Sequence, residues 1–394
     1  LGITQDGFSL RVVDMVTRLA TRLSYSATRG VAKAILGWAP STEAIELLVI
    51  GVGRRAPAFM ATQGEYEDDG EVLVIEVDGK AAPMATEAEL EARRQKRKHA
   101  PSCSCGCQRH RGRKRRKGEK KKRKKRGHNS KNGRSATLVA MYTLGRGEDG
   151  KLHGPINKKI WGQFGKRQEA MQWAREQATR RGFGPQTNKV IQIVVDGERC
   201  LRKQLQKLFP DATLTLDLRH AQEYLWKAGR LFHEEDSAEL EAWVRPLNEL
   251  LLAGQIDRLL KRLRKIQSAV ALRGPNTKKK REGLQKHIEF YEPRREMMQY
   301  GKYHRDDLVL ATGVIEGACR YVIGERLDCS GMRWTLAGAE PLLQLRCIEL
   351  NGDWSHFSTW ISEQTTAELK NGTLVKLRGP TPTSEKKRME KRVA

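Results

Sequence analysis

The sequence predicts an α/β protein with a mixed sheet, interrupted by an all-α insertion and preceded by a helical module. Short β-branched apolar runs at residues 71–77 and 190–195 are typical of buried strands. Amphipathic stretches of helical period alternate with these runs, and residues 237–298 carry helical periodicity with no strand signal. A hydrophobic fraction of 38% in 394 residues is enough for a sizeable core, and this length favours two or three domains.

Residues 1–53 have the pattern of three short helices with tight connections. Val12, Val16 and Leu19 share one face of the first helix, and Pro40 and Ser41 precede the third. Such a module is typical of a helix-turn-helix DNA-binding unit, in which residues 41–48 would be the recognition helix. The alternative is a small helical bundle packed on the next domain, and periodicity does not decide between them. We expect residues 54–70 to be a linker.

Residues 71–235 are predicted to form the first part of an α/β core. A basic insertion, residues 91–135, interrupts this part, and residues 236–310 form the α-helical insertion. Residues 311–353 return to the core as its final helices, and residues 354–394 are expected to be a disordered basic tail. The core strands are predicted at 71–77, 137–144, 190–195 and 213–216, with a hairpin partner near 152–156, and its helices at 167–180, 199–208 and 221–232.

Three acids lie where metal-dependent chemistry on phosphates would need them. Asp78 and Asp196 each follow an apolar run and precede a glycine, which predicts that each strand stops at a turn and presents its carboxylate there. Glu316 is flanked by small residues near the start of a helical pattern, so that the other acids can approach it closely. Three such carboxylates can hold two divalent cations about 3.5–4 Å apart. Asp-Gly is also an ordinary turn signal, so these matches alone are weak.

The surrounding segments resemble DDE transposases of bacterial insertion sequences, in particular the Mutator-like branch and its Kra-type insertion-sequence family. Asp217 and His220 match the Cys/Asp-x-x-His motif that follows the second catalytic Asp in that family. Gly313–Cys319 matches the segment that carries the catalytic Glu, and Gly331–Trp334 extends it. The resemblance covers roughly residues 78–334. It implies a ribonuclease-H-like fold and a polynucleotidyl transferase that binds insertion-sequence ends and catalyses Mg²⁺-dependent DNA cleavage and strand transfer.

The resemblance also implies the site residues. Asp78, Asp196 and Glu316 would be catalytic and would hold two Mg²⁺ ions, which prefer hard carboxylate oxygens. Asp217 also lies at a strand end and competes with Asp196 as the second ligand. His220 would support the site, or else pair with Asp217 at a helix cap.

Arg333 and Trp334 are candidate DNA-binding residues. Trp334 would stack on an unpaired base, and a core tryptophan is the alternative interpretation.

The formal net charge of +27 indicates a polyanionic partner, and nucleic acid is the best match. Residues 93–134 contain 21 Lys or Arg and one acid, so this window supplies most of the excess charge. At its centre Lys114, Arg115 and Arg116 belong to a run almost free of apolar side chains. Such a run cannot fold alone, and we expect it to contact phosphates without reading bases. A solvated loop with incidental charge is the alternative.

The seven cysteines, an odd number without a secretion signal, predict reduced thiols. Cys103, Cys105 and Cys107 would be a candidate zinc site, but structural zinc usually takes paired Cys-x-x-Cys ligands. We therefore favour incidental thiols over a structural Zn²⁺. The chain begins at Leu1, which is typical of a fragment or of a non-standard start codon.

Double-stranded DNA, as transposon ends and target, is the expected partner, and synapsis implies a homodimer or a larger assembly. No apolar run approaches the roughly 20 residues of a membrane span, so we expect a cytoplasmic, nucleoid-associated protein without membrane contact. One rival is a non-catalytic DNA-binding protein, such as a decayed transposase or repressor, which has no need for carboxylates that repel phosphate. A second rival is a structure-directed nuclease on the same fold, which would cut without joining.

Overall fold

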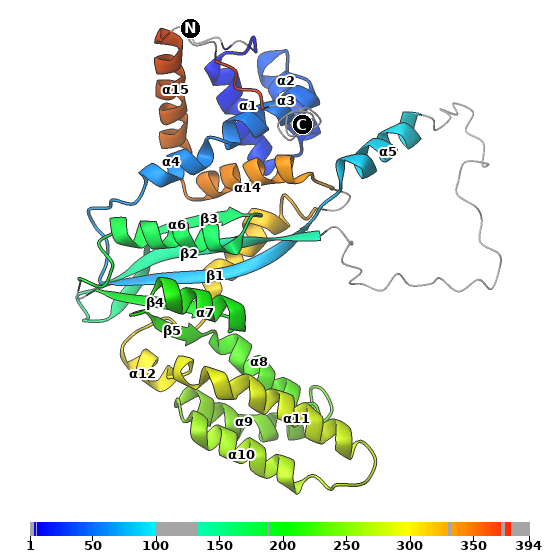
Figure 1. Cartoon of the computed structure of the whole chain (residues 1–394), viewed down its shortest axis with the longest axis vertical. Coiled ribbons are helices and arrows are strands. Elements are labelled where there is room, and N and C mark those ends of the chain that lie inside the picture. The colour runs from blue at the N-terminus through cyan, green and yellow to red at the C-terminus, as the bar shows by residue number, and fades with distance from the viewer. Residues whose placement is uncertain are drawn as a thin grey trace, which may run out of the picture.

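The computed structural model describes residues 4, 6–98, 133–187, 189–329, 332–371 and 375–379. It is an α/β structure with a mixed five-stranded sheet at its centre. Figure 1 shows one group of helices on one side of the sheet, with both described ends of the chain, and a helical insertion on the other side.

The strand order is β3-β2-β1-β4-β5. β1, β2 and β3 are antiparallel neighbours, whereas β4 runs parallel to β1 and β5 runs parallel to β4. β1 is buried continuously from Val72 to Val77, as expected for a central strand covered on both faces. The strands are β1 Val72–Pro83, β2 Gly133–Arg146, β3 Leu152–Gln163, β4 Val190–Val195 and β5 Thr213–Leu216.

Several core elements have the predicted bounds. β4 and β5, and the helices α6 Arg167–Arg180 and α7 Arg199–Leu208, coincide with their expected ranges. α8, Leu218–Gly229, begins three residues earlier than predicted. The reason is that Asp217 is its N-cap and accepts a hydrogen bond from the backbone N–H of Arg219 at 3.0 Å.

The prediction that β1 stops at Asp78-Gly79 is wrong. β1 continues to Pro83, because β2 pairs with it residue by residue through Asp78 opposite Leu138 as far as Pro83 opposite Gly133. A backbone whose N–H and C=O groups are satisfied in this way has no reason to turn. β4 does end before Asp196, where Gly197 adopts a φ of 83°.

The N-terminal module consists of α1 Leu10–Arg22, α2 Tyr25–Leu36 and α3 Thr42–Gly53, each N-capped by a serine. α3 is largely buried, and Ile45, Leu48 and Val49 have no exposed surface. It packs on α14, Leu336–Leu350. A recognition helix needs an exposed face, so residues 41–48 gain no support in that role. The arrangement is the one that a packed bundle predicts.

Residues 54–70 are not a free linker. They contain α4, Ala56–Thr62, and Asp69 forms a salt bridge with Arg181 at 2.6 Å in which both side chains are almost fully buried. Burial alone would raise the pKa of Asp69, but hydrogen bonds from Arg181, Asn157 and Thr143 outweigh it and hold that pKa below its ordinary value. This pair ties the segment to the end of α6.

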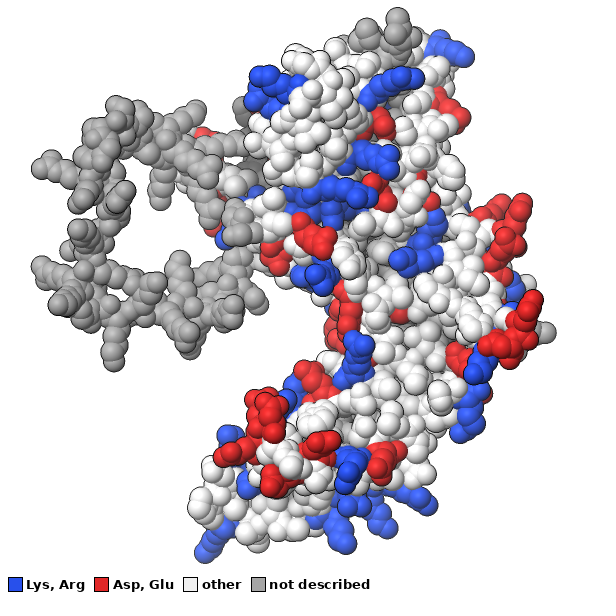
Figure 2. Space-filling model, turned by 180° about the vertical axis from the view of Figure 1, so that it is seen from behind, with Lys and Arg blue, Asp and Glu red and all other residues white. Residues whose placement is uncertain are grey.

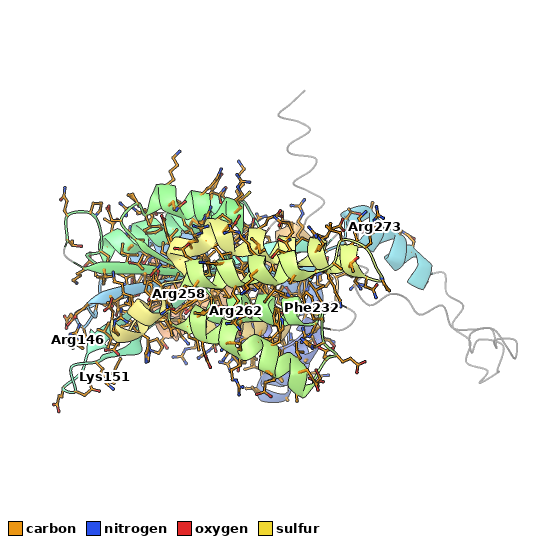
Figure 3. All side chains as sticks on the ribbon, turned by 90° about the horizontal axis from the view of Figure 1, so that it is seen from below. Arg146, Lys151, Phe232, Arg258, Arg262 and Arg273 are labelled. Atoms are coloured by element: carbon orange, nitrogen blue, oxygen red, sulfur yellow. The ribbon has the colours of Figure 1, made fainter. Side chains whose placement is uncertain are left out.

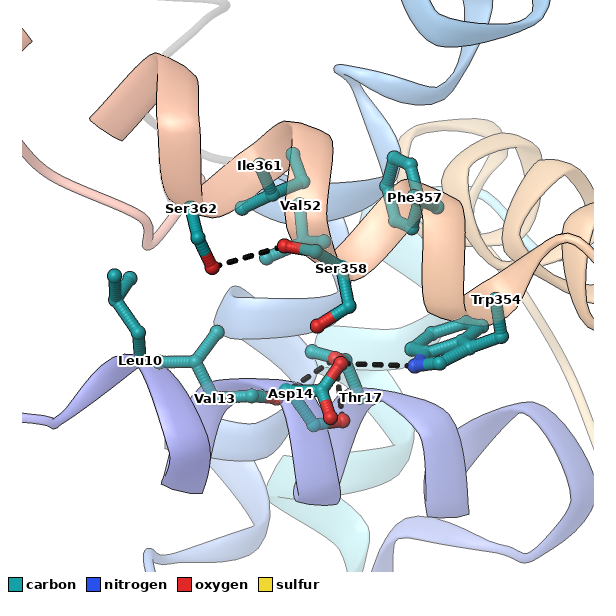
Figure 4. Close-up of a pocket in the computed structure, with 10 residues that line it drawn as sticks. All are labelled: Leu10, Val13, Asp14, Thr17, Val52, Trp354, Phe357, Ser358, Ile361 and Ser362. Carbon is teal, nitrogen blue, oxygen red and sulfur yellow. Dashed lines mark hydrogen bonds between the residues drawn. The ribbon is translucent and has the colours of Figure 1, made fainter. Parts of the chain in front are cut away.

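Residues 354–370 were expected to belong to a disordered tail, and this expectation is wrong. They form α15, Trp354–Lys370, which buries Trp354, Phe357 and Ile361. A small, mainly apolar cavity lies between α1 and α15, and on its wall Trp354 donates a hydrogen bond to Asp14 at 2.8 Å (Figure 4). The apolar positions follow a helical period within a polar sequence, which the charged composition of the region concealed.

The insertion after α8 contains three helices, α9 Ala238–Leu252, α10 Ile256–Ala269 and α11 Thr277–Tyr291. Contacts of α9 with α8 and α10, and of α10 with α11, form the bundle at one end of Figure 1. A 3₁₀ segment at 292–297 and α12, Tyr300–Arg305, return the chain to the sheet. This confirms the expected α-helical content of residues 236–310.

The basic insertion differs from its prediction at both ends. Residues 87–98 form α5, Glu87–Lys98, and residues 133–135 already belong to β2. Residues 99–132 lie outside the described residues, and with them Cys103, Cys105, Cys107, Lys114, Arg115 and Arg116. In the part of the chain that is described, no helix is both long and apolar enough to cross a bilayer.

Glu340 of α14 lies in a groove between α4, α14 and the start of β2, where its carboxylate accepts a hydrogen bond from the backbone N–H of Phe164 at 2.7 Å. Burial raises the pKa of Glu340 from 4.5 to about 7. Because the pKa of Glu340 is higher in the folded than in the unfolded protein, its protonated carboxyl contributes its full stabilisation below pH 4.5. This stabilisation is lost as the pH rises through 7. We expect Glu340→Gln to be more stable than wild type at pH 8, by about 1–2 kcal/mol, and to flatten the decline of stability between these pH values.

Urea unfolding at pH 4.5, 6, 7 and 8 measures this difference. Glu363→Gln, on the exposed side of α15, is the matched control and should leave the pH dependence unchanged. Parallel pH profiles for wild type and Glu340→Gln would contradict the assignment.

Candidate active site

Asp78, Asp196 and Asp217 each lie one or two residues beyond the last pair of a register between adjacent strands. Glu76 of β1 pairs with Val194 of β4, and Val195 of β4 pairs with Leu216 of β5. Asp78 and Asp196 each lie two residues beyond the first of these pairs, and Asp196 and Asp217 each lie one residue beyond the second. The backbone N–H of Asp217 still donates to the carbonyl of Val195 at 2.9 Å. Neighbouring strands are about 4.8 Å apart, so this contact keeps the backbones of Asp196 and Asp217 close.

Asp78 faces the helix that carries Glu316. Its Oδ1 accepts a hydrogen bond from the N–H of Gly79 at 2.6 Å, and the Cys319 thiol donates to its Oδ2 at 3.6 Å. Cys319 lies one helical turn after Glu316. Burial and the neighbouring Asp78 raise the pKa of Cys319 to about 12, so the thiol is a neutral donor.

Glu316 lies on α13, Gly313–Ala318, which continues into a π-helical segment, Cys319–Gly324. Its carboxylate is exposed and lies 3.7 Å from the guanidinium of Arg219. Arg219 follows Asp217 by two residues, so Glu316 is brought near the first turn of α8. Nothing lies within 4 Å of where a Cβ on Gly313 would point, which leaves the approach to α13 open on that side.

Asp196 is the more accessible of the two candidates for the second acid. It is exposed, and its Oδ1 accepts one hydrogen bond, from the N–H of Glu198 at 3.0 Å. Asp217 is 5% exposed, and both of its oxygens accept hydrogen bonds, from Arg219 N–H and from the Thr312 hydroxyl at 2.7 Å. The structure therefore gives Asp217 a capping role and leaves Asp196 better placed to bind a ligand.

His220 does not pair with Asp217, contrary to the cap alternative. Its ring lies against Tyr224 and Phe290, with centroids 5.4 and 5.9 Å away. Its Nδ1 is 4.0 Å from Glu223. His220 is thus packed between α8 and α11, in the vicinity of Asp217 but facing the insertion.

Trp334 is a core residue. It is 8% exposed, and its indole N–H donates to the carbonyl of Leu327 at 2.9 Å. The guanidinium of Arg326 lies over the ring, 5.0 Å from its centroid. This arrangement leaves no ring face for an unpaired base, so the stacking role is not supported. Arg333 is exposed and remains accessible.

Glu76 is a site residue that the sequence prediction missed. It has no exposed surface, and its carboxylate accepts hydrogen bonds from the Tyr142 hydroxyl at 2.7 Å and from the Ile315 N–H at 2.8 Å. Burial raises the pKa of Glu76, and these hydrogen bonds partly oppose the shift. The sequence does contain a signal for Glu76, because it is an acid in the middle of an otherwise apolar strand.

The carboxylates do not converge on one point. Among the described residues, no group of three His, Cys, Asp or Glu side chains is arranged to hold a metal ion. Each carboxylate instead has its own neighbours. Asp78 accepts hydrogen bonds from a thiol and a backbone N–H, and Asp196 accepts one from a backbone N–H. Glu316 lies near an exposed guanidinium. Carboxylate oxygens are the hard ligands that Mg²⁺ prefers, but in this arrangement they do not form a shared site.

Comparisons with known proteins add no relative: no protein-family model matches the chain, and no curated protein matches it either.

Proposed function

We propose that the chain is a DDE-type DNA transposase, a polynucleotidyl transferase that binds insertion-sequence ends and catalyses Mg²⁺-dependent DNA strand cleavage and strand transfer. The observation that carries the proposal is that Asp78 lies on β1 and Asp196 directly follows the adjacent parallel strand β4, while Cys319, three residues after Glu316, donates a hydrogen bond to Asp78. We infer that these acids, from three segments far apart in the chain, lie near one another beyond the carboxyl end of β4.

The sheet supports the same proposal. Three antiparallel strands followed by two parallel ones, in the order β3-β2-β1-β4-β5, is the order of a ribonuclease-H-like sheet. The proposed second acid follows β4, and the third comes after the helical insertion, on α13. The insertion lengthens the chain between the proposed second and third acids, and the slow growth of loop-closure entropy with length makes such an insertion tolerable.

Asp78, Asp196 and Glu316 would hold two Mg²⁺ ions. Bound there, the ions would supply an activated water or 3′-hydroxyl and would stabilise the leaving 3′-oxygen. The present partners of the three carboxylates are easily given up, because a neutral thiol, single backbone N–H groups and a distant exposed guanidinium all bind weakly compared with a divalent cation.

DNA binding is supported by basic side chains on the outer surface of the insertion. Lys261, Arg262 and Lys265 of α10 are exposed and have no carboxylate partner among the described residues. Figure 3 labels Arg258, Arg262 and Arg273 on this end of the molecule, and Figure 2 shows basic side chains at the same end. In Figure 2 acidic side chains lie among the basic ones, and a hollow separates this end from the rest of the molecule. The proposed partner is double-stranded DNA, held by at least two copies of the chain in the cytoplasm.

A second candidate is favoured by one observation, the lack of convergence of the three carboxylates. A non-catalytic DNA-binding protein, descended from a transposase, would retain the fold and the charge without a competent site. The two candidates differ in whether Mg²⁺ supports chemistry.

The test uses a duplex that carries the ends of the element encoding the chain. With Mg²⁺, the wild-type protein should nick at the element's ends and then join the 3′-ends to target DNA. Binding without cleavage in either Mg²⁺ or Mn²⁺ would support the non-catalytic protein instead. Cutting that ignores the ends and is never followed by joining would indicate a structure-directed nuclease.

The salt dependence of DNA binding should come largely from the basic insertion. Replacing Lys120–Arg126, seven consecutive cations, with Gly and Ser is expected to lower the slope of log K against log salt by about 0.9 for each phosphate that the protein no longer neutralises. Affinity should fall for specific and random duplexes alike, because binding to phosphates carries no sequence information. Fluorescence anisotropy at salt concentrations from about 50 to 200 mM, where affinity for phosphates falls steeply, measures both quantities.

The matched control keeps composition and charge by shuffling the order of residues 109–126. It should bind like wild type if the run contacts phosphates alone. A weaker affinity in the shuffled protein would mean that the order of residues matters, and an unchanged slope after the Gly/Ser replacement would place the phosphate-binding residues elsewhere.

A further inference from the structure

Glu76 is an ionisable side chain with no exposed surface in the central strand. An acid at such a position is costly unless its oxygens are hydrogen-bonded. Here both are: Oε1 accepts from the Tyr142 hydroxyl of β2, and Oε2 accepts from the backbone N–H of Ile315 on α13. One carboxylate therefore joins three elements that are far apart in the chain.

The elements joined by Glu76 are those that carry the first and third acids. Glu76 and Asp78 are two residues apart in β1, so their side chains lie on the same face of the sheet. Ile315 immediately precedes Glu316. The bond from Ile315 N–H to Glu76 at 2.8 Å thus fixes the start of α13 against β1, one residue from Glu316 and two from Asp78.

Resting on the function proposed above, we propose that Glu76 is a positioning residue whose bond to the Ile315 N–H sets the distance between Asp78 and Glu316. The side chain acts through α13, and it does not itself contact substrate. Each of its oxygens accepts a hydrogen bond from another element, and the side chain has no exposed surface, so it is not accessible to a substrate.

Two substitutions distinguish the length of the Glu76 side chain from its charge. Glu76→Asp keeps the charge but is shorter by one methylene, so it cannot hold both Tyr142 and Ile315. Glu76→Gln keeps the reach: its amide oxygen can accept from Ile315, and the Tyr142 hydroxyl can accept from its NH₂ group. Tyr142→Phe is the matched control, because it removes the other partner of Glu76 and leaves the bond to Ile315.

Hydrogen exchange of the backbone amides of residues 313–318 reports directly on whether Glu76 holds α13 in place. It is measured by mass spectrometry on the full chain, without DNA or metal. We expect exchange about tenfold faster in Glu76→Asp and within about threefold of wild type in Glu76→Gln and Tyr142→Phe. Wild-type exchange in Glu76→Asp would overturn the inference. Faster exchange in Glu76→Gln than in wild type would also overturn the inference. This variant changes the site least, so the test remains decisive if Glu76→Asp does not fold.

End cleavage supplies the second measurement. Glu76→Asp should cleave about a hundredfold more slowly at unchanged DNA affinity, and Glu76→Gln should retain most of the wild-type rate. If Glu76→Gln were as inactive as Asp78→Asn, Glu76 would act through its charge and the positioning role would be refuted. If the wild-type protein cleaves no DNA, the proposed function fails, whereas the exchange rates still report whether Glu76 anchors α13.

Discussion

If the proposed function is right, Asp78→Asn, Asp196→Asn and Glu316→Gln are each expected to lower the rate of DNA end cleavage by roughly a thousandfold, because each would remove a charged oxygen ligand from a site proposed to hold two cations. DNA affinity should stay the same or rise slightly, since a carboxylate repels nearby phosphate. Single-turnover cleavage of a labelled duplex in Mg²⁺, together with anisotropy for binding, measures both effects. Near-wild-type cleavage in any of the three variants would remove that residue from the site.

Asp217→Asn is the informative control for this series. Asp217 caps α8 and accepts a hydrogen bond from Thr312. Its substitution should therefore lower the free energy of unfolding and leave the cleavage rate of the folded protein nearly unchanged. Asparagine can still accept at an N-cap, which limits the loss to about 1 kcal/mol. If instead Asp217→Asn abolished cleavage and Asp196→Asn did not, the second acid would be Asp217.

Arg346→Ala is expected to have the largest effect on stability, a loss of about 3 kcal/mol or more in the free energy of unfolding. The Arg346 guanidinium is 5% exposed and donates hydrogen bonds to three backbone carbonyls, those of Thr21, Tyr321 and Val322. Alanine would leave three buried acceptors without donors, as well as a cavity. Burial and the nearby Arg326 lower the pKa of Arg346 to about 10, so it is still charged near neutral pH.

Urea unfolding monitored by tryptophan fluorescence measures this loss. Arg333→Ala, an exposed arginine thirteen positions earlier in the chain, is the control and should change stability by less than about 0.5 kcal/mol. Arg346→Lys should fall between the two, because an ammonium group cannot span three carbonyls as a planar guanidinium does. A change as small as that of Arg333→Ala would mean that the three carbonyls are satisfied in some other way.

Local patterns were sufficient for much of the sheet and its helices. β4, β5, α6 and α7 were predictable to the residue, because each is a periodic segment bounded by Gly, Pro or an acid that ends it. Asp196 was placed correctly for the same reason, since the glycine after it adopts the left-handed conformation that the turn requires.

The remaining differences have tertiary causes. Nothing in Asp78-Gly79 itself reveals that β2 will pair beyond it, so its turn signal was overridden by a partner strand that is remote in sequence. The same limit applies to Trp334, whose environment is formed by Arg326 and Tyr25 from other parts of the chain. Glu76 was overlooked because its partners, Tyr142 and Ile315, are remote in sequence, and an isolated acid in an apolar strand does not reveal them.

The extension of β1 and β2 past the end of β4 gives the molecule a built-in spacer. Asp78 pairs with Leu138 and Pro83 with Gly133, so five ladder steps, about 17 Å, separate the acid from the place where the chain re-enters the sheet after its most cationic stretch. On a duplex rising about 3.4 Å per base pair, that interval corresponds to about five base pairs. Under the proposed function, lengthening or shortening this two-stranded arm would shift the phosphates bound by the basic insertion relative to the site of cleavage, without changing either the acids or the charges.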